Sequence, residues 1–261
     1  MRERNFEPLR DSKGGRKLKR SIYILPSIFT VGNIFAGFIA LVATLSGQYQ
    51  QAAIAIGVAV ILDGLDGRVA RLANVTSDFG VHLDSLADTI SFGIAPAILV
   101  YSWGLADFGN FARFSSFLFL ICGVMRLARF NVQVCDLKQF AGLPIPAGGG
   151  FIAATVHFFP DPPDVPFFKP LLVGATYLVS LLMISTIRYP SLKQLNFGRG
   201  KSHLVILTLA LLVAGVYYYS QYVLVVIAYT YLLSGPLVRF YQSIKYRLKR
   251  SHPRSTEEAQ F

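Results

Sequence analysis

Four aspartates lie in two closely spaced pairs within an apolar part of the sequence. Asp63 and Asp66 are three residues apart, and Asp84 and Asp88 are four residues apart. Both spacings place the two carboxylates of a pair on one face of a helix, and the short connection makes the two helices antiparallel neighbours. Four converging acids repel one another unless divalent cations bind them, and all-oxygen ligands favour Mg²⁺, Mn²⁺ or Ca²⁺. The spacing therefore predicts a site for two such ions, which would suit phosphoryl transfer.

A structural role is the alternative for these aspartates, either as helix caps or as partners of Arg68 and Arg71. Two arginines cannot neutralise four acids, so we favour the metal site. Asp78 is interpreted differently, because its position after Thr76 and Ser77 is typical of a residue that caps the next helix.

Small residues accompany the acids. Gly64, Gly67, Ala70 and Gly80 keep the backbone accessible, and a ligand could lie against it. Small residues also let membrane helices pack closely, so this feature alone does not distinguish binding from packing.

The elements that carry these acids are expected to be membrane helices. Of the 261 residues, 53% are hydrophobic and 15% are charged, whereas about a quarter of a typical soluble domain is charged. Apolar runs recur that are long enough to cross a hydrocarbon core of roughly 30 Å. We expect an all-α, polytopic integral membrane protein. About eight transmembrane helices are predicted, at 23–46, 50–71, 81–103, 113–130, 144–159, 167–187, 203–219 and 221–241. The last two could instead form one re-entrant segment.

The basic residues indicate orientation. The formal net charge is +11, but Lys and Arg flank apolar runs, which argues against a nucleic-acid partner. All of them except Arg113 and Lys169, or 23 of 25, fall on one side of the predicted helices. By the positive-inside rule both termini and the acidic site are cytoplasmic, in the cell (inner) membrane.

The remaining segments give the expected domain organisation. Residues 1–22 are interpreted as a basic cytoplasmic tail, either disordered or lying on anionic lipids, and not as a cleavable signal. Residues 23–188 form the expected catalytic membrane core, 189–241 two additional helices, and 242–261 a basic cytoplasmic tail. The two cysteines, Cys122 and Cys135, give no disulfide framework.

The aspartates also carry a family resemblance. The pattern D-x2-D-G-x2-A-R-x8-G-x3-D-x3-D is matched at every position between Asp63 and Asp88, and it resembles the signature of the CDP-alcohol phosphotransferases. The resemblance implies a six-helix core, commonly a homodimer. It also implies two divalent cations held by Asp63, Asp66, Asp84 and Asp88, with Asp88 as the general base.

A narrower resemblance concerns the acceptor. The segments "DSLADTISFGIAPA", "RLARFN" and "GLPIPAGG" resemble the phosphatidylserine synthase branch, as does the first helix. Ser85 and Thr89 stand where the phosphatidylglycerophosphate synthase branch usually has proline and lysine. The implied contacts of CDP-diacylglycerol are Gly67, Ala70, Arg71, Gly80, Thr30 and Asn33. The expected contacts of L-serine are Arg126, Arg129, Asn131 and Ser91, with Lys138, Arg188 and Lys201 as weaker candidates.

The expected reaction follows from these assignments. CDP-diacylglycerol, with its acyl chains among membrane lipids, would react with L-serine to give phosphatidylserine and CMP by direct displacement. An enzyme with the same chemistry and another acceptor, glycerol 3-phosphate or inositol phosphate, is one alternative. A divalent-cation transporter is the alternative from another class, because intramembrane acids often mark ion paths.

Overall fold

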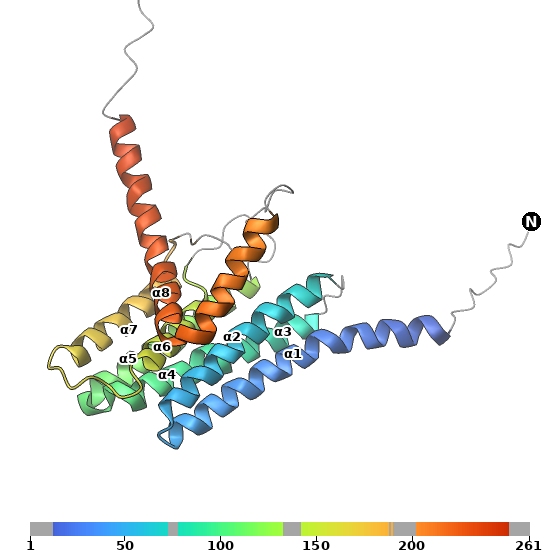
Figure 1. Ribbon diagram of the computed structural model, residues 1–261, viewed down its shortest axis with the longest axis horizontal. Coiled ribbons are helices and arrows are strands. Elements are labelled where there is room, and N and C mark those ends of the chain that lie inside the picture. The colour runs from blue at the N-terminus through green and yellow to red at the C-terminus, as the bar shows by residue number, and fades with distance from the viewer. Residues whose placement is uncertain (1–12, 73–77, 133–141, 188, 190–201, 251–261) are drawn as a thin grey trace, which may run out of the picture.

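The computed structural model describes residues 13–72, 78–132, 142–187, 189 and 202–250, and every element within these ranges is a helix (Figure 1). The long helices are α1 (Lys13–Leu45), α2 (Tyr49–Leu72), α5 (Asn110–Val132) and α8 (Ser202–Arg250). The shorter ones are α3 (Asp78–Asp88), α4 (Ala95–Val100), α6 (Ile145–Phe158) and α7 (Phe168–Ile184). Three short helical segments connect α3, α4 and α5. They are the π-helical turns η1 (Thr89–Ile94) and η2 (Tyr101–Leu105) and the 3-10 turn η3 (Ala106–Phe108).

The first two helices form an antiparallel pair, side by side in Figure 1. Gly47, with φ of 74°, reverses the chain between them, a conformation that glycine adopts without a steric penalty. Small buried residues line both helices, and small side chains allow two helices to approach each other closely. They are Ala36, Ala40 and Ala43 on α1 and Ala52, Ala53, Ala55 and Ala59 on α2.

The third stretch of helix departs from the single regular helix predicted over 81–103. It runs from Asp78 to Phe108 and alternates α-helix with two π-helical turns, η1 and η2. Pro96 lies in the first turn of α4, directly after the π turn η1. A π turn contains an extra residue, so it changes which side chains face each neighbour on either side of it.

The remaining core helices pack around this stretch. α5 packs against α7, and α6 packs against α2 and α8. Gly142, with φ of 91°, precedes α6, and a Cβ there would lie 2.2 Å from the carbonyl oxygen of Met183. The interior is filled mainly by large side chains from η1, α4, α5, α6 and α7. They include Phe92, Leu99, Phe119, Ile145, Ile152 and Met183.

The two ends of the chain contain more helix than expected. α1 begins at Lys13, ten residues before the predicted start, and α8 continues to Arg250, beyond the predicted end at 241. The predicted bounds followed the hydropathy of the sequence, which falls where a helix leaves the bilayer. A helix can continue beyond that point, because Lys and Arg are good helix formers in water as well. Thus the segments 13–22 and 242–250, predicted as tails, are helical.

α8 has two arms that meet at a sharp bend (Figure 1). Tyr219 has non-helical dihedral angles, φ −135° and ψ 44°, inside an otherwise continuous helix. This break lies within the region where the sequence predicted two helices to separate. Tyr229 and Tyr222 of the second arm contact Phe151 and Phe158 of α6, with ring centroids 4.7 and 5.4 Å apart.

Four helices of the described residues are long and apolar enough to cross a membrane, as expected for a membrane protein. They span Ile28–Leu45, Phe79–Phe108, Asn110–Val132 and Ala214–Phe240. α6 and α7 are apolar but shorter. The total of eight spans and the orientation of the termini stay predictions.

Candidate active site

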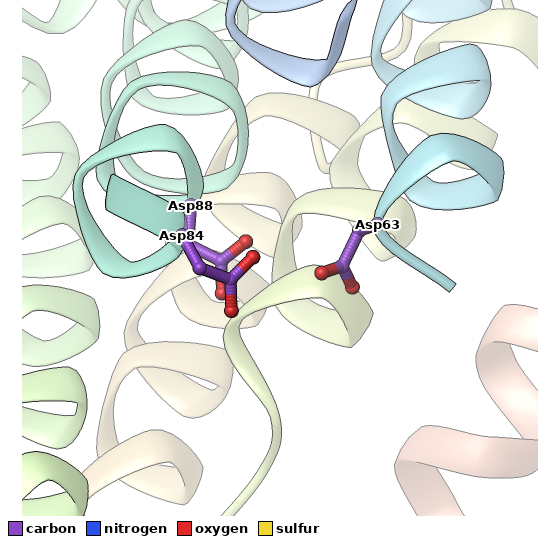
Figure 2. A group of neighbouring side chains, drawn as sticks. All are labelled: Asp63, Asp84 and Asp88. Atoms are coloured by element: carbon purple, nitrogen blue, oxygen red, sulfur yellow. The ribbon is translucent and has the colours of Figure 1, made fainter. Parts of the chain in front are cut away.

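Three of the four aspartates gather at one end of the helical bundle. Asp63 projects from α2, and Asp84 and Asp88 project toward it from α3 (Figure 2). One carboxylate oxygen of each lies within 4.8 Å of the others. Asp84 and Asp88 are one helical turn apart, so the predicted spacing on one face of the helix accounts for their proximity.

Asp66 is close to this group but is held differently. It is buried, and its carboxylate accepts a hydrogen bond from the hydroxyl of Thr30 in α1. Its charge still acts on Asp84 and Asp88. The structure therefore brings three predicted ligands together and tethers the fourth to α1. From the sequence, Thr30 was assigned to the binding of CDP-diacylglycerol, and its contact with Asp66 was not predicted.

The donor set fits a divalent cation. Carboxylate oxygens are the ligands that hard cations prefer, and three of them converge here. One oxygen of Asp88, Oδ1, is buried and has no hydrogen-bond partner within the described part of the chain. A buried acceptor without a donor calls for an explanation, and a bound cation would provide one.

Arg126 is the basic side chain that approaches this cluster from α5. It is half-buried and interacts electrostatically with Asp88 and with Tyr231 of α8. Its Nε is buried, and no acceptor for it is found in the described segments. Arg129, one turn later, is exposed. The structure thus distinguishes two arginines that the sequence treated alike, and it adds Tyr231, which sequence reasoning missed.

Asn131 and Ser85 connect α5 to α3. The amide of Asn131 donates a hydrogen bond to the hydroxyl of Ser85, at 3.0 Å. The Ser85 hydroxyl lies 3.0 Å from the carbonyl of Val81 in its own helix. Asn131 therefore has a structural contact close to the acids. This position is compatible with the predicted contact between Asn131 and the substrate serine.

Ser91 and Asn33 meet inside the protein. Ser91 is fully buried, and its hydroxyl donates a hydrogen bond to the backbone carbonyl of Asn33, at 2.8 Å. The side-chain amide of Asn33 is also buried, and within the described residues neither of its polar atoms has a partner. The amide of Asn33 is thus available for the predicted contact with a ligand, whereas the hydroxyl of Ser91 already has an acceptor.

The other predicted contacts lie around the end of α2. Gly67 is exposed, Gly80 is half-buried, and a Cβ at Gly64 would have no neighbour within 4 Å. Ala70 and Arg71 belong to the last turn of α2, and their side chains fall outside the described part. The weaker candidates Lys138, Arg188 and Lys201 also lie outside the described residues.

Comparison with known proteins identifies relatives of the whole helical core. The family model for CDP-alcohol phosphatidyltransferase matches residues 23–187. A CDP-diacylglycerol–serine O-phosphatidyltransferase of Helicobacter pylori is 38% identical over 198 residues, 73% of this chain and 81% of the relative. The protein of that name from Mycobacterium leprae is 32% identical over 249 residues, 91% of this chain and 80% of the relative. An archaetidylserine synthase of Methanothermobacter thermautotrophicus is 38% identical over 173 residues, 65% of this chain and 71% of the relative.

Proposed function

Because the chain belongs to the CDP-alcohol phosphatidyltransferase family, we propose that it transfers the phosphatidyl group of CDP-diacylglycerol to L-serine. The products are phosphatidylserine and CMP. The convergence of Asp63, Asp84 and Asp88 carries the chemical part of this proposal. The acceptor is inferred from relatives that are named as serine transferases and resemble most of this chain.

The reaction exchanges one phosphorus–oxygen bond for another. The hydroxyl oxygen of serine attacks the phosphorus that bears the diacylglycerol, and the bond to the oxygen of CMP breaks. Two divalent cations, Mg²⁺ or Mn²⁺, held by Asp63, Asp66, Asp84 and Asp88, would stabilise charge on the pyrophosphate and on departing CMP. The four side chains would hold such ions at one end of the bundle, where α2 and α3 meet.

Asp88 is the proposed general base. Its buried Oδ1 has no hydrogen-bond donor among the described residues, so no protein donor competes with a cation or with the serine hydroxyl for this carboxylate. An ordinary aspartate is a weak base for an alcohol. We therefore assign the proton transfer to a late stage of attack, and we assign much of the rate to positioning of the two substrates.

Arg126 is the proposed contact for the carboxylate of serine. Its guanidinium interacts with Asp88, so a carboxylate bound there would bring the serine hydroxyl close to the base. The planar donors of arginine suit a carboxylate. Arg71, with Gly67, Ala70, Gly80 and the amide of Asn33, is proposed to hold the CDP group.

The membrane explains why the acids lie at the end of the bundle. The acyl chains of the donor stay in the bilayer, while serine arrives from water, so the two meet at the interface. We propose that this interface is the cytoplasmic face of the cell (inner) membrane, because basic residues concentrate on that side of the predicted helices. Residues 23–188 are the proposed catalytic core, in a homodimer.

A reconstituted assay tests the proposal. The purified protein is given CDP-diacylglycerol with serine, glycerol 3-phosphate or inositol phosphate, and both lipid product and CMP are measured. We expect CMP release only with serine, its loss on adding a chelator, and its return with Mg²⁺ or Mn²⁺. CMP release with a phosphorylated acceptor instead would refute the choice of serine. Metal-dependent cation uptake into vesicles without CMP release would refute the enzyme.

A further inference from the structure

One face of α1 contacts both helices that carry the acids. Thr30, Asn33 and Gly37 are spaced i, i+3 and i+7 on α1, a spacing that places them on one side. Thr30 donates a hydrogen bond to Asp66 of α2, and the carbonyl of Asn33 accepts one from Ser91 of η1. α1 is therefore connected to the acidic end of α2 and to the turn that directly follows Asp88.

The bond of Ser91 differs from those of most other buried hydroxyls. It connects residues that are 58 positions apart and belong to different elements. Five other buried hydroxyls instead donate to the carbonyl four residues earlier in their own helix, a bond that links no two elements, although the hydroxyl of Thr155 also lies 3.3 Å from that of Tyr229 in α8. These five are Thr44, Ser115, Thr155, Thr176 and Ser180.

Gly37 makes this contact possible. A Cβ on Gly37 would lie 2.4 Å from the Ser91 hydroxyl oxygen and 2.9 Å from its Cα. Since the second distance involves backbone, a side-chain rotation could not relieve it. The absence of a side chain at Gly37 thus lets η1 lie directly on the backbone of α1.

The position of Asp88 depends on this contact. Asp88 is the last residue of α3, and the π-helical turn η1 starts at the next residue. The extra residue of a π turn rotates the helix on one side of it relative to the other, so the place of the turn affects the direction of the side chains that precede it. The hydrogen bond of Ser91, three residues beyond Asp88, joins η1 to α1, and in this arrangement Asp88 faces Asp63 (Figure 2).

We propose that Ser91 is a positioning residue, whose hydrogen bond to the Asn33 carbonyl above Gly37 holds Asp88 in line with Asp63 and Asp84. This inference rests on the proposed function for its effect on catalysis. It replaces the earlier assignment of Ser91 to the acceptor serine. Ser91 acts through Asp88 and does not contact the substrate.

Ser91→Ala tests the proposal, with Ser180→Ala as the matched control. Both serines are fully buried and donate to a carbonyl, but Ser180 does so within α7. For Ser91→Ala we expect kcat to fall about ten-fold and the KM for serine to stay within about two-fold. Binding of Mn²⁺ to the protein without substrate, measured by electron paramagnetic resonance, should weaken to a similar extent. Ser180→Ala should change none of these values.

Gly37→Ala approaches the same contact from α1 and leaves the hydroxyl in place. We expect the same loss of kcat and of Mn²⁺ binding. Gly57→Ala is its control, because a Cβ at Gly57 has no neighbour within 4 Å. The Ser91→Ala variant keeps the proposal testable if Gly37→Ala does not fold.

Two outcomes would overturn the inference. A selective rise in the serine KM of Ser91→Ala, with Mn²⁺ binding unchanged, would assign Ser91 to the substrate pocket. A lower melting temperature with unchanged kcat and Mn²⁺ binding would reduce it to a packing residue. If the wild-type protein binds Mn²⁺ but releases no CMP, the proposed function fails, while Mn²⁺ binding by the variants still tests the role of Ser91.

Discussion

The two ends of the helical bundle differ in how their charged and polar side chains are paired. At the end where α2 meets α3, three carboxylates lie within 4.8 Å of one another. At the other end, about nineteen residues along the same stretch of helix, Asp107 forms an ion pair with Lys169. There the indole of Trp103 donates to the carbonyl of Pro160, at 3.1 Å, and His157 lies 2.9 Å from the hydroxyl of Ser220.

This difference separates groups that stabilise the fold from groups that await a ligand. Pairing acids with bases and donors with acceptors lowers the cost of burial. Among the described residues, most buried side-chain atoms without a partner cluster near the acids, on Asn33, Asp88 and Arg126. Buried polar atoms without a partner that gather beside a group of acids point to a ligand at that end.

The largest expected effect comes from the acids themselves. Asp63→Asn, Asp84→Asn and Asp88→Asn should each lower kcat/KM by roughly 100-fold or more. Bound metal ions stabilise the transition state by several kcal/mol, and each loss of about 1.4 kcal/mol lowers the rate ten-fold. CMP release by purified variants measures this. Asp107→Asn, which changes an acid at the other end, is the control and should stay active. Near-normal turnover of any of the three variants at saturating metal would exclude that residue from the site.

The second prediction compares Arg126 with Arg129 at the acidic end. Arg126 is half-buried beside Asp88 and Arg129 is exposed. Loss of a charge-assisted contact costs roughly 1.5–3 kcal/mol. Arg126→Ala should therefore lower kcat/KM for serine by about 10- to 150-fold, with Arg129→Ala near wild type. Titration of serine at saturating donor measures both, and CDP-diacylglycerol binding should persist.

The opposite result has a defined meaning. If Arg126→Ala abolishes binding of CDP-diacylglycerol and leaves the serine KM unchanged, Arg126 belongs to the phosphate site. The carboxylate of serine would then have to be sought at Lys138, Arg188 or Lys201.

Thr30 should have a smaller effect than the acids it supports. Thr30→Val keeps the shape of the side chain but removes the hydrogen bond to Asp66. Groups that orient metal ligands commonly change metal affinity by about 10- to 100-fold, and we expect the lower value because Asp66 lies outside the three-carboxylate group. The metal concentration for half-maximal CMP release measures this. Thr30→Ser, which retains the hydroxyl, should restore the wild-type value, and an equal loss in both variants would contradict the role of the hydrogen bond.

Local patterns account for what the sequence predicted well. The prediction of a helix over 50–71 agrees closely with α2 at Tyr49–Leu72, and that over 144–159 with α6 at Ile145–Phe158. Apolar runs with clear polar or proline boundaries predict such helices. The convergence of Asp63 with Asp84 and Asp88 followed from helical spacing and a short connection.

What the sequence did not predict depends on contacts between distant segments. The hydrogen bond from Thr30 to Asp66 joins residues 36 positions apart, and Tyr231 approaches Arg126 from a helix outside the matched family region. The π turn at η1 is set by how Ser91 packs on α1, and hydropathy carries no signal for it. The acids could thus be identified from spacing, whereas the groups that hold them could not.

The smallest expected effect is at the end opposite the acids. Ser220→Ala removes the hydrogen-bond partner of His157, whose other ring nitrogen is already buried without a partner in the described region. Leaving a buried polar group unpaired costs about 1–3 kcal/mol, so the melting temperature in detergent should fall. Because this end contributes to packing of α8 on α6 and not to chemistry, kcat per folded molecule should stay within about two-fold of wild type. Ser46→Ala, at an exposed hydroxyl just after α1 that donates to the carbonyl of Val42, is the control for stability and should change neither value. A loss of kcat in Ser220→Ala comparable to that of the aspartate variants would show that both ends take part in catalysis, and the distinction between them would then be wrong.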